Sequence, residues 1–447
     1  MHVGKPWRKL SMQNTNDLWL GSVPDEWQSF RIKDVAQLSP GFSDGTPELT
    51  ELCTVVPMEA VSEKGTIDTN DIKEYDLITS GLTKFEVGDV IFAKITPCME
   101  NGKGAFVEKL PTKYAFGSTE FHVLRLGHKA DGRFFYYYTY NSVYRDYAEA
   151  NMTGVARQKR VSSRFINYTR IFLPVLTEQR LIAAYLDKTC AAIDAAIEAK
   201  GRQLELLDAL RKSIIHKAVT RGLDDSVELK DSGVEWIRLI PIHWRCEHLK
   251  RVSLKIQTGT TPPTENTEYY VDGTIPWFAP GCYDKGIYLE EPAKLINELA
   301  YHDNKLRLFP AQSIFLVGIG ATIGKVAMTK TEASCNQQIT GIVIRPEVSP
   351  KYMAYQMKIY EDIIPYISKY TTLPIMDQVK IGYLRVALPP RVEQEIIANY
   401  LDDKMQQITK LESSLQNQIS SLEGYCKSLI HECVTGKRRI TEDDLKD

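Results

Sequence analysis

A carboxylate stands directly beside an amide at two places in the chain, Glu178-Gln179 and Glu393-Gln394. A carboxylate in such a position can act as a general acid or base. Each pair, however, follows a proline at the expected start of a helix, where a carboxylate complements the helix dipole and caps free N–H groups. We therefore predict no catalytic residue here and interpret all four side chains as helix caps.

A glycine-rich run, GIGATIGK at residues 318–325, is a second candidate because glycine-rich turns can hold phosphates. It fits neither common pattern, since Ile323 stands where the third glycine of G-x-G-x-x-G belongs and Ile319 stands where a phosphate-binding loop would begin. The longer segment that contains it, IFLVGIGATIGKVAM at residues 314–328, reads instead as a strand, a turn and a strand, and so does VIFAKITPCMENGKGAF at residues 90–106. Because Gly-Lys recurs in both turns, we predict that Lys103 and Lys325 are presented to DNA.

The run TGVARQKRVSSRFINYTR, residues 153–170, carries five basic residues and no acidic one. Lysine and arginine neutralise phosphates and release counterions, and arginine or glutamine can bond the edges of guanine or adenine. The whole chain has a net charge of −2, so contact with nucleic acid must depend on local charge of this kind. The predicted DNA-binding residues of this run are Arg157, Gln158, Lys159, Arg160 and Arg164.

The second half of the chain has a weaker polar signal and lacks a comparable basic run. Its candidates lie in QTGTTP (residues 257–262), CNQQIT (335–340) and the region that begins at residue 368. Glutamine and asparagine suit the N6 and N7 atoms of adenine, which is why these loops are selected. The predicted DNA-binding residues here are Thr260, Thr261, Asn336, Gln337, Gln338, Thr371 and Thr372.

The composition excludes several other classes of protein. The chain has 447 residues, of which 43% are hydrophobic and 25% charged, typical of a globular protein with about three domains. It contains no apolar run long enough to cross a bilayer and no signal peptide at its first residues, so we expect a cytoplasmic protein with no membrane contact. Its eight cysteines form no C-x-x-C pair, and Cys426 and Cys433 lie on a predicted helix, which favours core packing. We predict no metal site.

The chain contains an internal repeat. LPVLTEQRLIAAYLD at residues 173–187 and LPPRVEQEIIANYLD at residues 388–402 share nine of fifteen positions, at an offset of 215. Upstream of each segment stands a W-x4-P-x2-W pattern, at residues 19–27 and again at residues 236–244. Since internal repeats reveal the architecture, we predict two related halves, each with an α/β body and a long helix.

The two helices should be long, because proline is absent after their first turn and helix-forming residues dominate. A seven-residue apolar seam runs through Ile408, Leu415, Leu422 and Leu429, with Leu411 and Tyr425 at the alternate positions. Helices of about 40 residues would span about 60 Å and pair as a coiled coil. The alternative is two unrelated helices, each packed on its own body. Two diverged bodies with a rigid spacer suit the spacing of DNA half-sites, about 34 Å or multiples of it.

These features resemble the specificity subunit of type I restriction–modification enzymes, over essentially the whole chain. The resemblance implies an α+β fold in which two target-recognition domains are joined by an antiparallel pair of long helices. The implied boundaries are residues 14–173 and 231–388 for the target-recognition domains, and residues 174–222 and 389–436 for the helical spacer regions.

The resemblance also implies a function and partners. Each recognition domain would read one half of a split site in double-stranded DNA. The chain would dock two modification subunits, which bind S-adenosylmethionine and methylate adenine, and restriction subunits with motor and nuclease activity. The residues implied in this docking are Glu178, Gln179, Glu393 and Gln394. The chain itself would bind no cofactor and catalyse nothing, in keeping with the absence of an N/D-P-P-Y/F motif. Two alternatives remain: a specificity chain whose partner combines restriction and methylation, and a coiled-coil scaffold without DNA contact.

Overall fold

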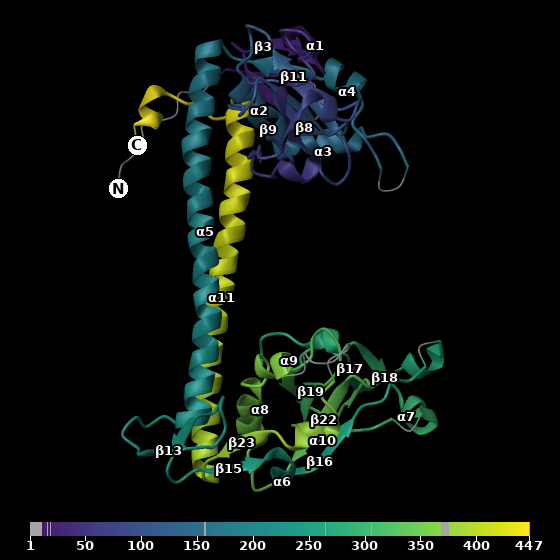
Figure 1. Ribbon diagram of the computed structural model, residues 1–447, viewed down its shortest axis with the longest axis vertical. Helices are drawn as coiled ribbons and strands as arrows, with labels where there is room; N and C mark the ends of the chain where they lie inside the picture. Colours follow the sequence, from purple (N-terminus) through teal and green to yellow (C-terminus); the bar gives the residue numbers. More distant parts are fainter. Residues whose placement is uncertain are drawn as a thin grey trace. The chain divides into compact units, whose positions relative to one another are not determined.

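The computed structural model describes residues 11–15, 17, 19–155, 158–263, 265–304, 306–367 and 375–446. The chain divides into two compact units, each of which is described by itself. Unit 1 comprises residues 1–199 and 417–447, and unit 2 comprises residues 200–416. Each unit therefore holds one globular body together with the first part of one long helix and the last part of the other (Figure 1).

The body of unit 1 is built on two four-stranded sheets, with the strand orders β6-β5-β10-β7 and β4-β11-β8-β9. β10 runs parallel to β5, and all other neighbours in these two sheets are antiparallel. Helices α2, α3 and α4 complete the body. The elements are β1 (Met12–Asn14), β2 (Ser22–Pro24), β3 (Gln28–Arg31), α1 (Ile32–Val35), β4 (Ala36–Leu38), β5 (Leu52–Val56), β6 (Ile72–Glu74), β7 (Thr83–Phe85), β8 (Val90–Ala93), β9 (Gly104–Phe106), β10 (Tyr114–Gly117), β11 (Phe121–Leu126), α2 (Gly132–Tyr140), α3 (Ser142–Ala150), α4 (Ser163–Tyr168) and β12 (Arg170–Leu173).

The body of unit 2 repeats this plan. The sheet order β4-β11-β8-β9 recurs as β16-β22-β19-β20, and the parallel pair β5/β10 recurs as β17/β21. The predicted strand–turn–strand units are confirmed as the antiparallel pairs β8/β9 and β19/β20. The elements are β13 (Leu229–Asp231), β14 (Leu239–Pro241), β15 (Arg245–His248), α6 (Leu249–Val252), β16 (Ser253–Thr258), β17 (Ile275–Phe278), β18 (Lys294–Ile296), α7 (Glu298–Asn304), β19 (Ile314–Val317), β20 (Val326–Met328), β21 (Ser334–Cys335), β22 (Ile339–Ile344), α8 (Pro350–Lys358), α9 (Ile363–Ile367), α10 (Gln378–Gly382) and β23 (Arg385–Leu388).

The aromatic side chains of α2 and α8 form the centre of each core. Phe134, Phe135 and Tyr138 of α2 are fully buried, and Tyr352 and Tyr355 of α8 are buried to the same degree. Helical spacing places these residues on one face, which is buried and therefore is not a surface on which bases could stack. The same helices also bind the long helices, because Tyr137 and Tyr355 donate hydrogen bonds to Asp187 and Asp402, at 2.7 and 2.8 Å.

The two long helices are α5 (Leu176–Arg221, 46 residues) and α11 (Arg391–Val434, 44 residues). In unit 1 the Sγ atom of Cys190 on α5 lies 3.5 Å from the Sγ atom of Cys426 on α11. In unit 2 the buried Arg211 of α5 forms an ion pair with Glu412 of α11. The first part of each helix thus pairs with the last part of the other, which confirms the antiparallel pairing. No helix among the described residues is both long and apolar enough to cross a membrane.

The predicted apolar seam is confirmed at its main positions and wrong at the alternate ones. Ile408 and Leu429 are buried, and Leu415 and Leu422 are half-buried. Leu411 and Tyr425, in contrast, are about half exposed, at 55% and 47%. The physical reason is that two paired helices cover only a narrow stripe of each other, so residues beside that stripe remain in contact with solvent.

A tryptophan in each unit lies where one long helix begins and the other ends. In unit 1 the Nε1 atom of the buried Trp27 donates a hydrogen bond to Glu178 Oε1 on the first turn of α5, at 3.4 Å. Just after the end of α11, Gly436 has a left-handed φ of +71°, and a Cβ atom there would lie 2.9 Å from Trp27 Cζ2. Glycine at this position therefore both ends the helix and makes room for the indole ring.

Unit 2 contains the same junction with the two helices exchanged. Trp244 donates from Nε1 to Glu393 Oε1 on α11, at 3.0 Å. Gly222, which follows α5 with a φ of +78°, would place a Cβ atom 3.3 Å from Trp244 Cζ2. The repeated W-x4-P-x2-W and Glu-Gln patterns thus contact each other in the folded chain.

The two glutamines of the Glu-Gln pairs bond the body to the start of each long helix. Gln179 is fully buried; its Oε1 atom accepts from Asp131 N at 2.8 Å, and its Nε2 atom donates to the carbonyls of Lys129 and Pro174, both at 2.9 Å. Gln394 accepts from Ser349 N at 2.8 Å and donates to the Pro389 carbonyl at 2.9 Å. Their burial does not suit the direct partner contact predicted for these residues. Glu178 and Glu393 lie in the first turns of their helices, as predicted, and each accepts a hydrogen bond from an indole; docking by the four residues stays a prediction.

We predict that Gln179→Ala destabilises the chain through the groups it leaves unpaired. Each buried polar group without a partner costs about 1–3 kcal/mol, so the free energy of unfolding should fall by about 3 kcal/mol. Urea unfolding of the variant, compared with the unchanged chain, measures this difference. Gln203→Ala, on the exposed surface of the same helix, is the matched control. Equal stability of the two variants would contradict the role assigned to Gln179.

Candidate nucleic-acid interface

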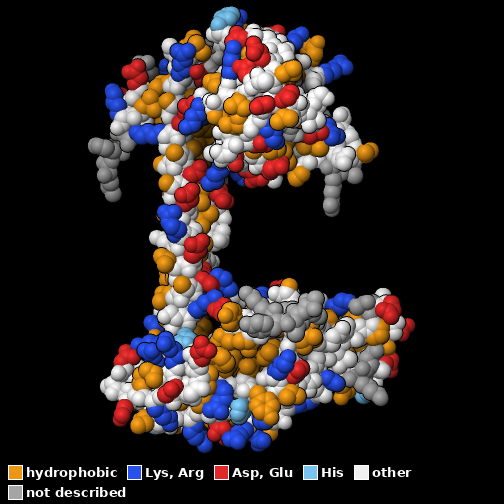
Figure 2. Space-filling view, in the orientation of Figure 1, with side chains coloured by type: hydrophobic (Ala, Val, Ile, Leu, Met, Phe, Trp, Pro, Cys, Tyr) orange, Lys and Arg blue, Asp and Glu red, His pale blue; other side chains and the backbone are white. Residues whose placement is uncertain are grey.

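On the side of the protein shown in Figure 2, positive charge is not gathered over the face of either unit. In Figure 2, Lys and Arg side chains are interspersed with Asp and Glu over the visible side of each unit. This agrees with the net charge of −2 for the chain. A surface for nucleic acid must therefore be sought in particular loops.

The basic run predicted to contact DNA begins as an exposed loop between α3 and α4, seen in Figure 1 as a loop that extends from the body of unit 1. Thr153 and Arg160 pair through their backbones and close the loop, with N–O distances of 3.0 and 2.8 Å. Gln158 and Lys159 are exposed in the loop, and Arg164 is exposed on α4. Arg157 lies outside the described residues. The loop thus presents polar and basic side chains to solvent, as a contact with phosphates requires.

Arg160 has an acidic partner that its own stretch of sequence does not contain. Its Nε and Nη2 atoms donate to both carboxylate oxygens of Glu120, with the shortest contact at 2.8 Å. The hydrogen bond from Arg160 lowers the pKa of Glu120, whose carboxylate is therefore charged at neutral pH. The positive charge of the run is accordingly smaller than its sequence indicates.

Glu120 belongs to a turn, residues 118–120, that has a counterpart in unit 2 at residues 336–338. In unit 1, Glu120 N donates to Ser118 Oγ at 3.2 Å, and Phe121 N donates to Ser118 O at 3.1 Å. In unit 2, Gln338 N donates to Asn336 Oδ1 at 2.9 Å, and Ile339 N donates to Asn336 O at 3.1 Å. Three of the residues predicted to contact DNA, Asn336, Gln337 and Gln338, therefore form the equivalent of a turn that the sequence analysis missed.

Two further loops meet this turn in each unit, through the same backbone hydrogen bonds. In unit 1, Lys94 N donates to Glu120 O and Val161 N donates to Lys94 O. In unit 2, Gly318 N donates to Gln338 O and Met376 N donates to Gly318 O. We name these assemblies the first corner (residues 94–96, 118–120 and 158–161) and the second corner (residues 318–320, 336–338 and 375–378). Each corner brings three loops together at the end of a sheet.

The second corner borders a cleft of about 340 Å³, which is also lined by Thr258 and Thr340. Gln378 Nε2 donates to Thr258 Oγ1 at 2.8 Å, and Asn336 Nδ2 donates to Gln338 Oε1 at 3.1 Å. Gln337 is exposed and, among the described residues, its amide has no hydrogen-bond partner. The corner therefore offers amide and hydroxyl groups together with one exposed carboxylate, that of Asp377, which caps α10.

Of the four threonines predicted to contact DNA, the structure describes two. Thr260 and Thr261 are half-buried beside this corner, and the Thr260 carbonyl accepts from Trp277 Nε1 at 3.0 Å. Thr371 and Thr372 lie outside the described residues. Contacts of these four threonines with DNA stay predictions.

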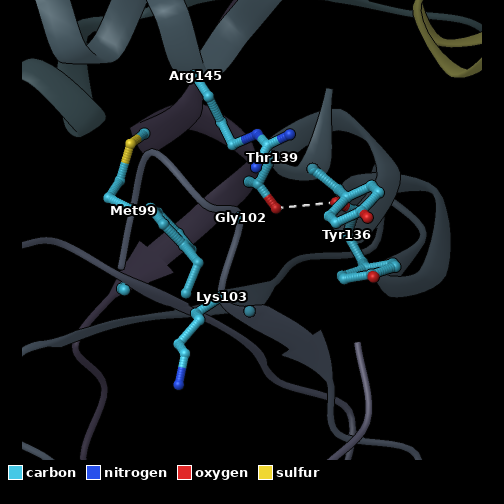
Figure 3. Close-up of a pocket in the computed structure, with 10 residues that line it drawn as sticks. Met99, Gly102, Lys103, Tyr136, Thr139 and Arg145 are labelled. Atoms are coloured by element: carbon cyan, nitrogen blue, oxygen red, sulfur yellow. Dashed lines mark hydrogen bonds between the residues drawn. The ribbon is translucent and has the colours of Figure 1, made fainter. Parts of the chain in front are cut away.

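The two predicted Gly-Lys turns hold their lysines against the protein. Lys103 Nζ donates to the carbonyl of Met58 at 3.2 Å, and Lys325 Nζ donates to the carbonyl of Tyr283 at 3.5 Å. In Figure 3, Lys103 extends away from the small cavity that Tyr136 and Arg145 line. Gly102 has a φ of +79°, and a Cβ atom there would collide with the Arg145 guanidinium. Both lysines therefore hydrogen-bond to the backbone of their own unit. Contact of Lys103 and Lys325 with DNA stays a prediction.

His122 lies beneath the first corner and is buried. Its Nε2 atom is 2.9 Å from the carbonyl of Val161, the residue that follows Arg160. Burial lowers the pKa of His122 from 6.5 to about 4, so at neutral pH the ring is uncharged and donates this bond from Nε2. In the described part of the chain, no group of three or more His, Cys, Asp or Glu side chains is arranged to hold a metal ion.

Two copies of one α/β body, each with a polar corner of three loops and a share of two paired helices, define a tandem recognition protein. The family model of the type I restriction modification DNA specificity domain matches residues 24–206 and 248–421, that is, most of both halves. The chain belongs to this family, whose domain is one of DNA target recognition.

Individual relatives agree with this assignment. The specificity subunit of the type I restriction enzyme EcoAI from Escherichia coli is 29% identical over 222 residues, 48% of this chain. That match spans only 36% of the length of the EcoAI subunit. A putative specificity subunit, MjaX of Methanocaldococcus jannaschii, is 23% identical over 441 residues, which cover 96% of this chain and 97% of that one.

Solved structures share the fold. A chain from a structure concerned with complex assembly and conformational transition of the type I R-M system has a TM-score of 0.76 at 18% identity, covering 93% of this chain and 99% of that one. The HsdS subunit from Thermoanaerobacter tengcongensis has a TM-score of 0.56 at 18% identity, covering 93% and 98%.

We predict that His122 makes the stability of the chain depend on pH. The unfolded chain binds a proton near pH 6.5 and the folded chain only near pH 4, so stability is lost as the pH falls through this window. The loss attributable to this one group should reach about 2 kcal/mol at pH 5. Urea unfolding of the unchanged chain and of His122→Gln, at pH 8 and pH 5, measures it. A glutamine amide can still donate to Val161, and an equal pH dependence in both proteins would refute the assignment.

Proposed function

We propose that this protein is the DNA-binding specificity subunit of a type I restriction–modification enzyme. In this proposal the body of unit 1 reads one half of a bipartite DNA target and the body of unit 2 reads the other half. The observation that carries the proposal is the match of the DNA specificity domain to both halves of the chain, together with one loop corner built twice from different side chains. Different side chains on the same backbone suit an asymmetric target.

The chain has no catalytic role in this proposal and directs the chemistry of its partners. Two modification subunits, which bind S-adenosylmethionine and methylate adenine, dock on the chain, and restriction subunits complete the assembly. The exposed apolar side chains at the starts of α5 and α11, Val175, Val392 and Ile396, suit such docking better than the buried glutamines beside them. The paired helices set the length of the DNA that is not read between the half-sites.

A methylome measures the proposed function directly. The chain and the modification subunit encoded beside it are expressed in a methylation-free host, together and singly, and methylated adenines are mapped by single-molecule sequencing. We expect a split motif with a fixed gap, and only when both chains are present. Methylation by this chain alone would make it an enzyme. No methylation despite a soluble complex would favour a scaffold that binds proteins without DNA.

The spacer role predicts the effect of shortening both helices by one heptad at facing positions. Removal of residues 197–203 from α5 and residues 413–419 from α11 shortens the pair by about 10 Å, close to the rise of three base pairs. The methylome should show a gap shorter by about three base pairs or, where the new rotation between half-sites is not tolerated, no methylation. The half-site sequences should stay the same. New half-site bases would show that the helices, and not the bodies, read sequence.

A further inference from the structure

We infer that Arg160, held by Glu120, reads a guanine in the first half-site, and that Gln337, on the equivalent turn of unit 2, reads an adenine in the second. This inference rests on the proposed function and deepens it, because it names the base and the residue for each body. It starts from the two corners, which have the same backbone and different side chains.

The hydrogen bonds of Arg160 leave it suited to guanine. A guanidinium has five N–H donors: one on Nε and two on each Nη atom. Glu120 takes the Nε donor and one Nη2 donor, and the carbonyl of Gln158 takes one Nη1 donor at 3.3 Å. One N–H on each Nη atom has no partner among the residues that the structure describes. Guanine presents O6 and N7 in the major groove, and two adjacent donors on one guanidinium match these two acceptors.

The Glu120 carboxylate fixes the position of the guanidinium before DNA arrives. The Arg160 side chain is 42% exposed while Glu120 is 25% exposed, so the arginine reaches solvent and the carboxylate lies behind it. A side chain already held in one conformation loses less entropy on binding. Glu120 is therefore a positioning residue, and Arg160 is the one that contacts the base.

Neighbouring lysines keep the first corner attractive to DNA despite Glu120. Lys94, whose backbone N–H bonds the Glu120 carbonyl, also acts electrostatically on the Glu120 carboxylate. Lys159 is exposed beside Arg160. The corner thus carries three positive side chains and one negative one, and lysines at its edge can contact phosphates while Arg160 faces a base.

The second corner replaces the ion pair by neutral groups. The backbone hydrogen bonds show which positions of the two units are equivalent, and they place Gln338 at the position of Glu120. Ile95 in unit 1 is equivalent to Ile319 in unit 2. Because Ile95 pairs with Arg160 and Ile319 pairs with Ile375, Ile375 is at the position of Arg160. Asn336 and Gln338 bond each other, whereas the exposed Gln337 amide has no hydrogen-bond partner in the described part of the chain and keeps its donor and its acceptor. Adenine presents an N6 donor and an N7 acceptor, the pattern that a glutamine amide complements. The two corners therefore select different bases.

Methylomes of variant complexes test this assignment. With Arg160→Lys, which keeps the charge and loses the paired donors, we expect guanine preference at one position of the first half-site to fall about tenfold or more. The second half-site should not change. Gln337→Ala should relax one adenine of the second half-site only, so each variant is the control for the other. Changes in both half-sites, or in neither, would overturn the assignment.

The exchanged pair Glu120→Arg with Arg160→Glu separates base reading from a purely structural ion pair. The exchange keeps an ion pair in the corner and presents a carboxylate where the guanidinium stood. If the pair is only structural, the motif is retained. If Arg160 reads guanine, the guanine preference is lost and is not restored by the exchange.

The inference can also be tested with the unaltered complex, which is needed if a variant does not assemble. Replacing guanine by 7-deazaguanine removes the N7 acceptor, one position at a time, from a target oligonucleotide. We expect the replacement at one guanine of the first half-site to weaken binding about tenfold. Equal affinity at every position would overturn the inference while leaving the proposed function intact. Absence of any motif in the methylome of the unaltered complex would instead overturn the proposed function itself.

Discussion

The contact between an indole ring and the start of a long helix is the constraint on which each unit depends. Trp27 bonds Glu178 on α5, and the end of α11 packs on the same ring through Gly436. Trp244 does the same with Glu393 and Gly222. Each body therefore holds the beginning of one helix and the end of the other at a single buried side chain. This arrangement requires the two helices to be antiparallel and the chain to carry every part of the junction twice.

The repeated residues are those that join elements, and the diverged residues are those at the corners. Gln179 and Gln394 make equivalent bonds, as do Tyr137 with Asp187 and Tyr355 with Asp402. The turns at residues 118–120 and 336–338 share their backbone bonds and no residue type. This separation has a physical basis. A buried hydrogen-bonded contact between two elements is destabilised when either partner is replaced, because the other polar group is left unpaired. An exposed turn that is held by backbone hydrogen bonds tolerates many different side chains.

The sequence predicted the elements well because their signals are local and strong. The lengths of the long helices followed from residue propensity and the absence of proline. The alternate seam positions Leu411 and Tyr425 were predicted wrongly, because the number of neighbours around a helix determines the width of its buried stripe. Arg160 was judged by its basic neighbours in sequence, and its partner Glu120 stands 40 residues away. A charge count along the chain does not include such a partner.

By itself, then, the sequence determined that the chain is doubled, that each half ends in a long helix, and that unlike bodies separate the repeated segments. These features could be predicted because repeats and periodic residue patterns are visible in the amino-acid sequence itself. Only the tertiary structure decided what the repeated residues contact and which diverged residues are equivalent. The turn at Asn336–Gln338 has its counterpart at Ser118–Glu120 without one identical residue, and only matched backbone hydrogen bonds reveal it. Such bonds join residues that are distant in sequence. Because they are made by backbone atoms, they do not depend on residue type and cannot be inferred from the sequence.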